Sequence, residues 1–101
     1  MKTRAHKRIN INQDVHFRHR DKTHVGSIMN ISENGMLIKT HDNVLPLDLE
    51  MDIVIANRDS TMSIPVKLNK FIISPDYNDS IGVEILNPPE EFLDFVRSFS
   101  I

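Results

Sequence analysis

Residues 50–68 read EMDIVIANRDSTMSIPVKL, and the side chains along this stretch alternate between apolar and polar types. Successive residues of a β-strand point to opposite faces, so a period of two predicts strands that place one face against a core. The polar sequence Asn57-Arg58-Asp59-Ser60 separates two such runs and is typical of a turn. We therefore predict two neighbouring strands whose inward side chains are Met51, Ile53, Ile55, Met62, Ile64, Val66 and Leu68.

Four further segments are predicted to be strands: residues 12–20, 25–31, 36–40 and 80–86. In the second of these, simple alternation sets Ile28 and Asn30 on one face and Ile31 on the other. Residues 71–73 are expected to prolong the strand that contains Leu68, beyond a bend. Pro65 argues against uninterrupted central pairing at its position, because proline has no N–H to donate to a ladder. Six short strands without an intervening helix predict an all-β fold, a small antiparallel six-stranded barrel.

The hydrophobic period changes near the C-terminus, where we predict a helix over residues 88–99. Asn87 is a suitable N-cap, Pro88 is suited to the first helical position, and Glu90 adds an acid in the first turn. Four apolar residues then follow at the spacing i, i+3, i+4 and i+7, namely Phe92, Phe95, Val96 and Phe99. We expect this stripe to close one end of the barrel rather than to bind a partner.

The length of 101 residues predicts a single domain with an N-terminal arm at residues 1–9, a barrel at 12–86 and the C-terminal helix. The chain has no cysteine, which excludes disulfides, thiol catalysis and cysteine-ligated metal sites. No apolar run is long enough for a membrane span and no secretory signal follows the basic start, so we expect a cytoplasmic protein.

The net charge of −2 conceals an asymmetry between the two parts of the chain. Residues 1–24 contain seven Lys and Arg against two Asp and Glu, a balance of +5. The remaining 77 residues contain five against twelve, a balance of −7. A basic arm on an acidic body indicates a local anionic ligand rather than a long nucleic-acid surface.

Two motifs supply the chemistry for such a ligand: Arg-x-x-x-Arg at residues 4–8 and Asn-x-Ser-x-x-Gly at residues 30–35. The guanidinium groups of Arg4 and Arg8 can each donate two parallel hydrogen bonds to a phosphate or to the O6/N7 edge of guanine. The Asn30 amide can serve a guanine edge, and the Ser32 hydroxyl can serve a base or a phosphate. On a strand these two side chains share a face, and Gly35 would allow a turn with positive φ.

In this order and at this spacing the two motifs resemble the signature of the PilZ family, bacterial domains that bind cyclic di-GMP. PilZ domains are six-stranded antiparallel barrels with a C-terminal helix, and residues 80–85 (SIGVEI) are similar to their final strand. The resemblance implies that the cyclic di-GMP site consists of Arg4, Arg8, Asn30, Ser32 and Gly35. Thr3 stands where the family often has a basic or bulky residue, which leaves open whether one or two ligand molecules bind.

The resemblance also implies a stand-alone receptor whose arm orders over cyclic di-GMP and changes the surface offered to a protein effector. Two alternatives remain. One is a PilZ-fold adaptor that binds no nucleotide and acts through protein contacts, in type IV pili or motility. The other is a barrel that binds single-stranded nucleic acid. One Tyr and no Trp are few stacking platforms for that class, and we expect no nucleic-acid polymer as partner.

We expect neither catalysis nor a bound metal or other cofactor. Ser, His and Asp are present, but no nucleophile elbow or phosphate-binding glycine loop places them together. Among the five histidines, His16 and His19 are three apart, which puts them on opposite faces of a strand.

Overall fold

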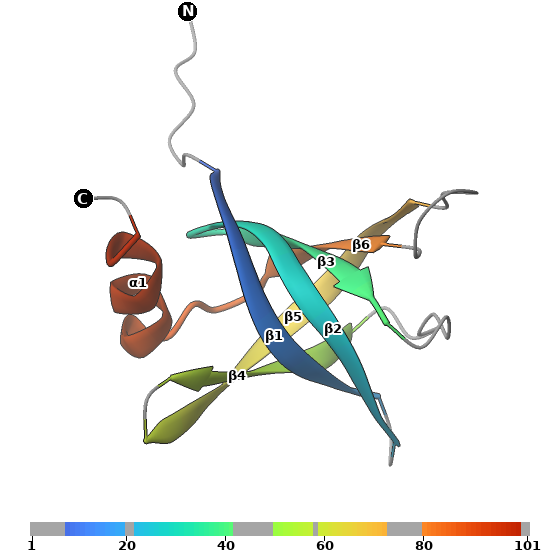
Figure 1. Cartoon of the computed structure of the whole chain (residues 1–101), viewed down its shortest axis with the longest axis horizontal. Coiled ribbons are helices and arrows are strands. Elements are labelled where there is room, and N and C mark those ends of the chain that lie inside the picture. The colour runs from blue at the N-terminus through green and yellow to red at the C-terminus, as the bar shows by residue number, and fades with distance from the viewer. Residues whose placement is uncertain (1–7, 20–21, 42–49, 58, 73–79, 100–101) are drawn as a thin grey trace, which may run out of the picture.

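Six strands close into an antiparallel barrel in the computed structural model, which describes residues 8–19, 22–41, 50–57, 59–72 and 80–99 (Figure 1). The strands are β1 (Ile9–His19), β2 (Lys22–Ser32), β3 (Gly35–Thr40), β4 (Glu50–Asn57), β5 (Ser60–Ile72) and β6 (Ser80–Ile85). Their order around the barrel is β1-β2-β3-β6-β5-β4, and a helix, α1 (Glu90–Arg97), follows β6. The predicted barrel with a C-terminal helix is confirmed.

The barrel is filled by the inward residues of all six strands. All seven inward residues predicted for β4 and β5 are buried, with at most 9% of each side chain exposed, so that prediction is confirmed. They pack with the apolar residues of the other strands: Val15, Phe17, Ile28, Ile31, Met36, Ile38, Ile81, Val83 and Ile85. The outward residues of the same strands are polar or charged for the most part, which explains the alternation in the sequence.

Pro65 lies inside β5 opposite Asp52, and the ladder with β4 continues through it. The ladder with β6 begins only at Val66, so pairing on both sides does not run through Pro65, as predicted. The Pro65 carbonyl accepts a hydrogen bond from the backbone N–H of Leu86 at 3.2 Å, one residue beyond the end of β6. The N–H and C=O of a strand residue point to the same side. The side of Pro65 that has no N–H therefore lies at the end of the β5–β6 ladder, and no hydrogen bond of that ladder is lost.

A β-bulge at Met29 reverses the predicted alternation of faces in the part of β2 that follows it. The register with β3 passes from Ile28 opposite Ile38 to Asn30 opposite Leu37, which leaves Met29 as an extra residue. Ile28 and Ile31 are consequently both fully buried, whereas the Asn30 side chain is on the outer surface. The prediction that Asn30 shares a face with Ile28 is wrong, because alternation in a sequence does not show an inserted residue.

A second bulge lies in β5, where the bend was expected. The register with β6 passes from Leu68 opposite Val83 to Lys70 opposite Gly82, which leaves Asn69 as the extra residue. The inward residues of β5 have even numbers up to Leu68, yet Lys70 is exposed. The bulge therefore turns Lys70 outward, as the bulge in β2 does for Asn30.

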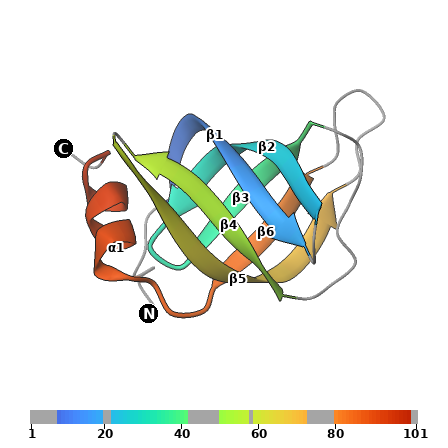
Figure 2. The ribbon, with the colours of Figure 1, turned by 90° about the horizontal axis from the view of Figure 1, so that it is seen from below.

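Helix α1 lies at one end of the barrel in both ribbon views (Figures 1 and 2), and its residues Phe92, Phe95 and Val96 join the core. The helix begins at Glu90 with Pro89 as its N-cap, so the predicted start at Pro88 with Asn87 as cap is wrong. A residue that precedes a proline is disfavoured in the helical region, which excludes Pro88.

Phe99 lies beyond the end of α1 and is 40% exposed, unlike the other three residues of the predicted stripe. Its ring makes an edge-to-face contact with Phe95, with ring centroids 5.1 Å apart. Three of the four residues thus close the barrel as predicted, and the fourth packs against Phe95 beyond the end of the helix.

This difference predicts the stability of two matched variants. Phe92→Ala should lower the free energy of unfolding by about 3–5 kcal/mol, because it leaves a cavity where a fully buried ring joins helix and barrel. Phe99→Ala should cost about 1 kcal/mol, since it removes an exposed edge-to-face contact. Urea unfolding followed by circular dichroism measures both. Equal losses would contradict the assignment of Phe92 to the core.

Candidate functional site

The two sequence motifs contact one another in the structure, through Arg8 of the first motif and Asn30 of the second. Arg8 Nη1 donates a hydrogen bond to Asn30 Oδ1 over 2.6 Å, across 22 residues of sequence. Arg8 immediately precedes β1, and the bulge at Met29 places Asn30 on the outer surface of β2 beside it. A guanidinium has five N–H donors, so this bond leaves others for a ligand. Arg8 and Asn30, both predicted as site residues, are therefore neighbours, and their contact with a ligand stays a prediction.

Gly35 completes this group through its lack of a side chain. A Cβ at this position would lie 3.0 Å from the Val83 carbonyl oxygen and 3.7 Å from Arg8 Nη2. Its φ lies outside the range from +20° to +160°, so the prediction that Gly35 provides a positive φ is wrong. Glu33 and Asn34 form the turn, and Gly35 is the first residue of β3. Its role is to let the Val83 carbonyl of β6 approach the backbone closely, whereas a Cβ would make only an ordinary contact with Arg8.

Ser32 is 1% exposed, and its hydroxyl is engaged within the turn that follows β2. Ser32 Oγ lies 2.8 Å from Asn34 Oδ1, and the Asn34 backbone N–H donates to Ser32 Oγ over 3.3 Å. The Asn34 carbonyl in turn accepts from the Ile85 N–H at 3.0 Å. Ser32 therefore shapes the turn of the motif, and its contact with a ligand stays a prediction.

A hollow of about 250 Å³ opens beside Arg8 and Asn30. It is lined by Arg8, Asn30, Met36, Leu37, Lys70, Ile72 and Gly82. Two of these residues are cationic, and none carries a carboxylate. The stem of Lys70 crosses Gly82, since a Cβ there would lie 3.0 Å from Lys70 Cγ and 3.1 Å from Lys70 Cε. The hollow thus combines two positive charges, an amide and apolar walls, which suits an anionic ligand with flat rings.

Lys70, Leu37 and Ile72 were not predicted as site residues. The signal for Lys70 was the break in alternation after Leu68, because a polar residue at an expected inward position indicates a bulge. Arg4, the other predicted arginine, lies outside the described residues, as do the rest of residues 1–7 of the predicted arm.

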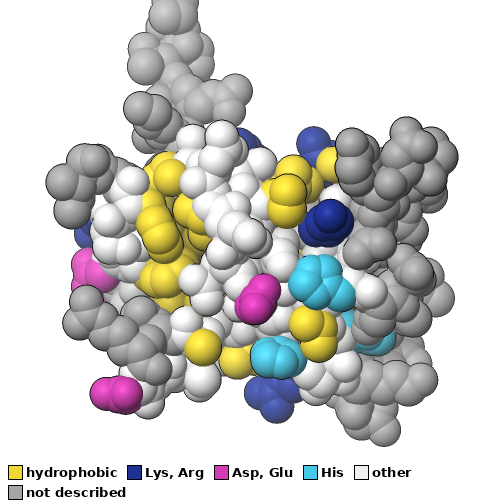
Figure 3. All heavy atoms as spheres, viewed as in Figure 1, with side chains coloured by type: hydrophobic (Ala, Val, Ile, Leu, Met, Phe, Trp, Pro, Cys, Tyr) yellow, Lys and Arg dark blue, Asp and Glu magenta, His cyan; other side chains and the backbone are white. Residues whose placement is uncertain are grey.

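A different polar network lies on the outer face of β1, β2 and the end of β3, where Figure 3 shows histidines beside acidic and apolar side chains. Ser27 Oγ lies 2.9 Å from His41 Nε2 and 3.3 Å from Asp14 Oδ1. A serine between a histidine and a carboxylate is not the order of a catalytic triad, in which the histidine is central. Within the described ranges, no group of three or more His, Cys, Asp or Glu residues could hold a metal ion.

With the fold and these contacts in place, comparison with known proteins identifies the family. The family model for the PilZ domain matches residues 2–99, and the chain therefore belongs to the PilZ family. A search of curated protein sequences gives no significant match. No helix in the described part of the chain is long and apolar enough to cross a membrane.

Two solved structures share the fold at low sequence identity. The PilZ domain of YcgR from Escherichia coli, solved with c-di-GMP, has a TM-score of 0.73 at 12% identity, with 98% of this chain and 92% of that chain covered. The inhibitor of motility MotI/DgrA of Bacillus subtilis has a TM-score of 0.78 at 11% identity, with 98% of this chain covered. The chain spans about half of the length of MotI/DgrA, with 50% of that chain covered. The family thus includes a domain with bound cyclic di-GMP.

The close approaches at two glycines predict different responses to added methyl groups. Gly35→Ala should lower the free energy of unfolding by about 1–3 kcal/mol, because the new Cβ meets the backbone carbonyl of Val83 in the neighbouring strand. Gly82→Ala should cost clearly less, because its Cβ meets the flexible side chain of Lys70, which can move aside. Urea unfolding of both variants tests the contrast. A larger loss for Gly82→Ala would contradict it.

Proposed function

We propose that this chain is a receptor for cyclic di-GMP, which binds at the hollow between Arg8, Asn30 and Lys70. The observation that supports the proposal most strongly is the lining of this hollow, with two cations, an amide and no carboxylate. Cyclic di-GMP carries two phosphodiester charges and two guanine edges. Each of these features has a counterpart in the lining, and no acidic side chain there would repel the phosphates.

Each side chain has a distinct part in this proposal. Arg8 lies over Gly35 and is oriented by its bond to Asn30, so its remaining donors can reach a phosphate or a guanine O6/N7 edge. Lys70 supplies a compact positive charge for a second phosphate oxygen. Leu37 and Ile72 offer apolar surface to the faces of the bases. Ser32 keeps the turn in shape, as its buried hydroxyl indicates.

Arg4 and the arm complete the proposed site. Ordering the backbone of a free segment costs about 1–2 kcal/mol per residue, hence on the order of 5–10 kcal/mol for residues 4–8. A micromolar affinity corresponds to about −8 kcal/mol, so the arginines alone do not suffice and the groups on β2, β3 and β5 must contribute. This balance lets the arm act as a switch that closes over the ligand and alters the surface offered to an effector.

In this proposal the chain has no catalytic residues and acts as a receptor and adaptor. An adaptor that binds no nucleotide is the alternative. The two arguments against it are the pair of arginines in the motif and the cationic lining of the hollow. Calorimetric titration with cyclic di-GMP separates these two functions.

The first test of the receptor is the loss of the Arg8 guanidinium. Arg8→Ala should weaken cyclic di-GMP binding about tenfold or more, because a bidentate contact is worth roughly 1–3 kcal/mol. Calorimetric titration with a native, untagged N-terminus measures the affinity and also the number of ligand molecules per chain. Arg18→Ala is the matched control, since Arg18 lies on β1 outside this hollow. No binding by the parent chain, or an unchanged affinity of Arg8→Ala, would overturn the proposal.

A second test concerns the lysine that the bulge turns outward. Lys70→Met keeps most of the stem over Gly82 and removes the charge, so cyclic di-GMP should bind several-fold more weakly and with a smaller dependence on salt. Lys67→Met is the control, because Lys67 is an exposed lysine on the same strand that does not line the hollow. Titrations at two salt concentrations compare the variants. Equal effects of both substitutions would show that only the overall charge matters.

A further inference from the structure

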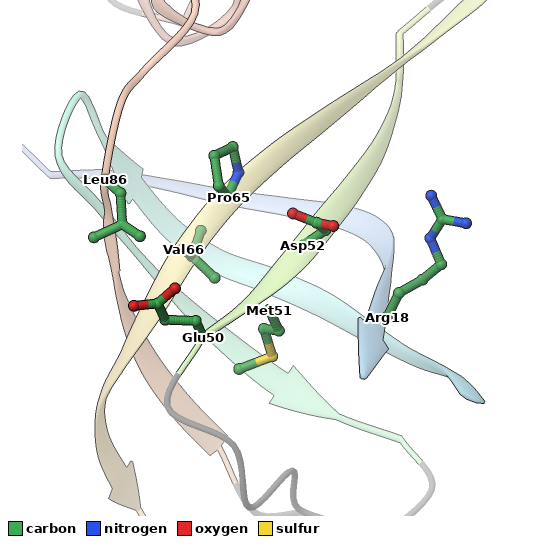
Figure 4. A pocket seen from close by; sticks show the side chains of 7 residues that line it. All are labelled: Arg18, Glu50, Met51, Asp52, Pro65, Val66 and Leu86. Atoms are coloured by element: carbon green, nitrogen blue, oxygen red, sulfur yellow. The ribbon is translucent and has the colours of Figure 1, made fainter. Parts of the chain in front are cut away.

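A second hollow of about 380 Å³ lies elsewhere on the barrel and shares no residue with the first. Its lining comes from β1, β4, β5 and the residue after β6: Arg18, Glu50, Met51, Asp52, Pro65, Val66 and Leu86 (Figure 4). None of these residues belongs to the two sequence motifs. A function at this hollow is therefore separate from ligand binding at Arg8.

The hollow forms where two ladders of the barrel end. Strand β6 ends at Ile85, so the chain leaves the sheet at Leu86, beside Pro65. The register of β1 with β4 runs only as far as Arg18 opposite Asp52, and Glu50 lies beyond it. Met51 and Val66 face the core between these two ends and form the floor. The depression is thus a consequence of strand lengths and is built on the sheet itself.

The charged side chains around this floor have no partner within the described structure. Glu50 and Asp52 are two apart on β4, both exposed, and therefore share the outer face. No hydrogen bond or ion pair with another described residue engages Glu50, Asp52 or Arg18. Leu86 is 42% exposed and, together with Pro65, provides an apolar wall. Two available carboxylates beside apolar surface suit a cationic side chain with an aliphatic stem.

We propose that this hollow docks an extended segment of a partner protein that carries a Lys or Arg next to an aliphatic residue. The aliphatic residue and the stem of the basic residue pack on Leu86 and Pro65. The positive charge lies between Glu50 and Asp52. Arg18 lies opposite Asp52, at the end of the hollow away from Leu86, and repels a second cation there, which sets the direction of the segment (Figure 4). This charge complementarity favours a basic peptide over an anionic or wholly apolar one.

Selection from a random heptapeptide library displayed on phage, against the whole immobilised protein, tests this surface. We expect enriched peptides with Lys or Arg beside an aliphatic residue. One such peptide, synthesised and titrated into the ¹⁵N-labelled chain, should shift the amide signals of residues 50–52, 66 and 86. The double variant Glu50→Gln/Asp52→Asn should bind it about fivefold more weakly or worse, since each exposed ion pair contributes modestly.

Glu84→Gln is the matched control, because Glu84 is an exposed carboxylate on β6 that does not line the hollow. It should leave the peptide affinity unchanged, and Arg8→Ala should do so as well. An equal loss for Glu84→Gln would indicate a general attraction to an acidic body and overturn the proposal. The proposal would also be overturned if no basic peptides were enriched, or if an enriched peptide shifted amide signals of the protein outside this hollow.

Sedimentation of the protein alone distinguishes a second copy of the chain as the occupant. Self-association that the double variant abolishes would replace the partner protein by another copy and overturn the proposal as stated. Titration of the double variant with cyclic di-GMP separates the two proposed functions, because the nucleotide affinity should be unchanged. If peptide binding at this hollow is not found, the proposal of a cyclic di-GMP receptor still stands. If cyclic di-GMP does not bind, the proposal of a peptide site still stands.

Discussion

Closure of six strands around one apolar core requires every side chain on these strands to lie either inside or outside, and the site depends on how that choice is made. Strict alternation would turn Asn30 inward with Ile28, and Lys70 inward with Leu68. Burying an amide and an ammonium without partners would be costly. The extra residues Met29 and Asn69 reverse the side at both places, so both polar groups reach the same external hollow.

The motif turn is rigid because the backbone and not the surface charges hold it. The Asn34 carbonyl is bonded to β6, and Ser32 bonds within the turn. Arg97 of α1 also reaches Glu33 over 3.3 Å, but both side chains are partly exposed and such a pair contributes about 1 kcal/mol at most. A turn fixed in this way holds Asn30 and Gly35 in a constant arrangement. In the proposed function, the arm that contains Arg8 closes over this fixed surface.

Much of the fold was predictable from residue types, and much less of the site. Alternation identified the strands, and the apolar stripe identified the helix, because both reflect burial of one face. The start of α1 was misplaced, since the effect of Pro89 on the preceding proline outweighed the suitability of Asn87 as a cap. The role of Gly35 was also predicted wrongly. A glycine in a sequence is consistent either with a positive φ or with close packing against its backbone. Only the position of the Val83 carbonyl in the folded barrel shows that close packing is the reason here.

The sequence by itself determined six strands, a helix, a basic N-terminal segment and the two motifs that resemble the PilZ signature. These features are local, since each depends on residues within one strand, turn or helix. Only the tertiary structure decided that Lys70 and Gly82 lie beside Arg8, and that Arg18, Glu50 and Leu86 surround a second hollow. These groupings depend on the registers of strands far apart in the chain. Registers are set by how the whole barrel closes, and the bulges at Met29 and Asn69 shift them.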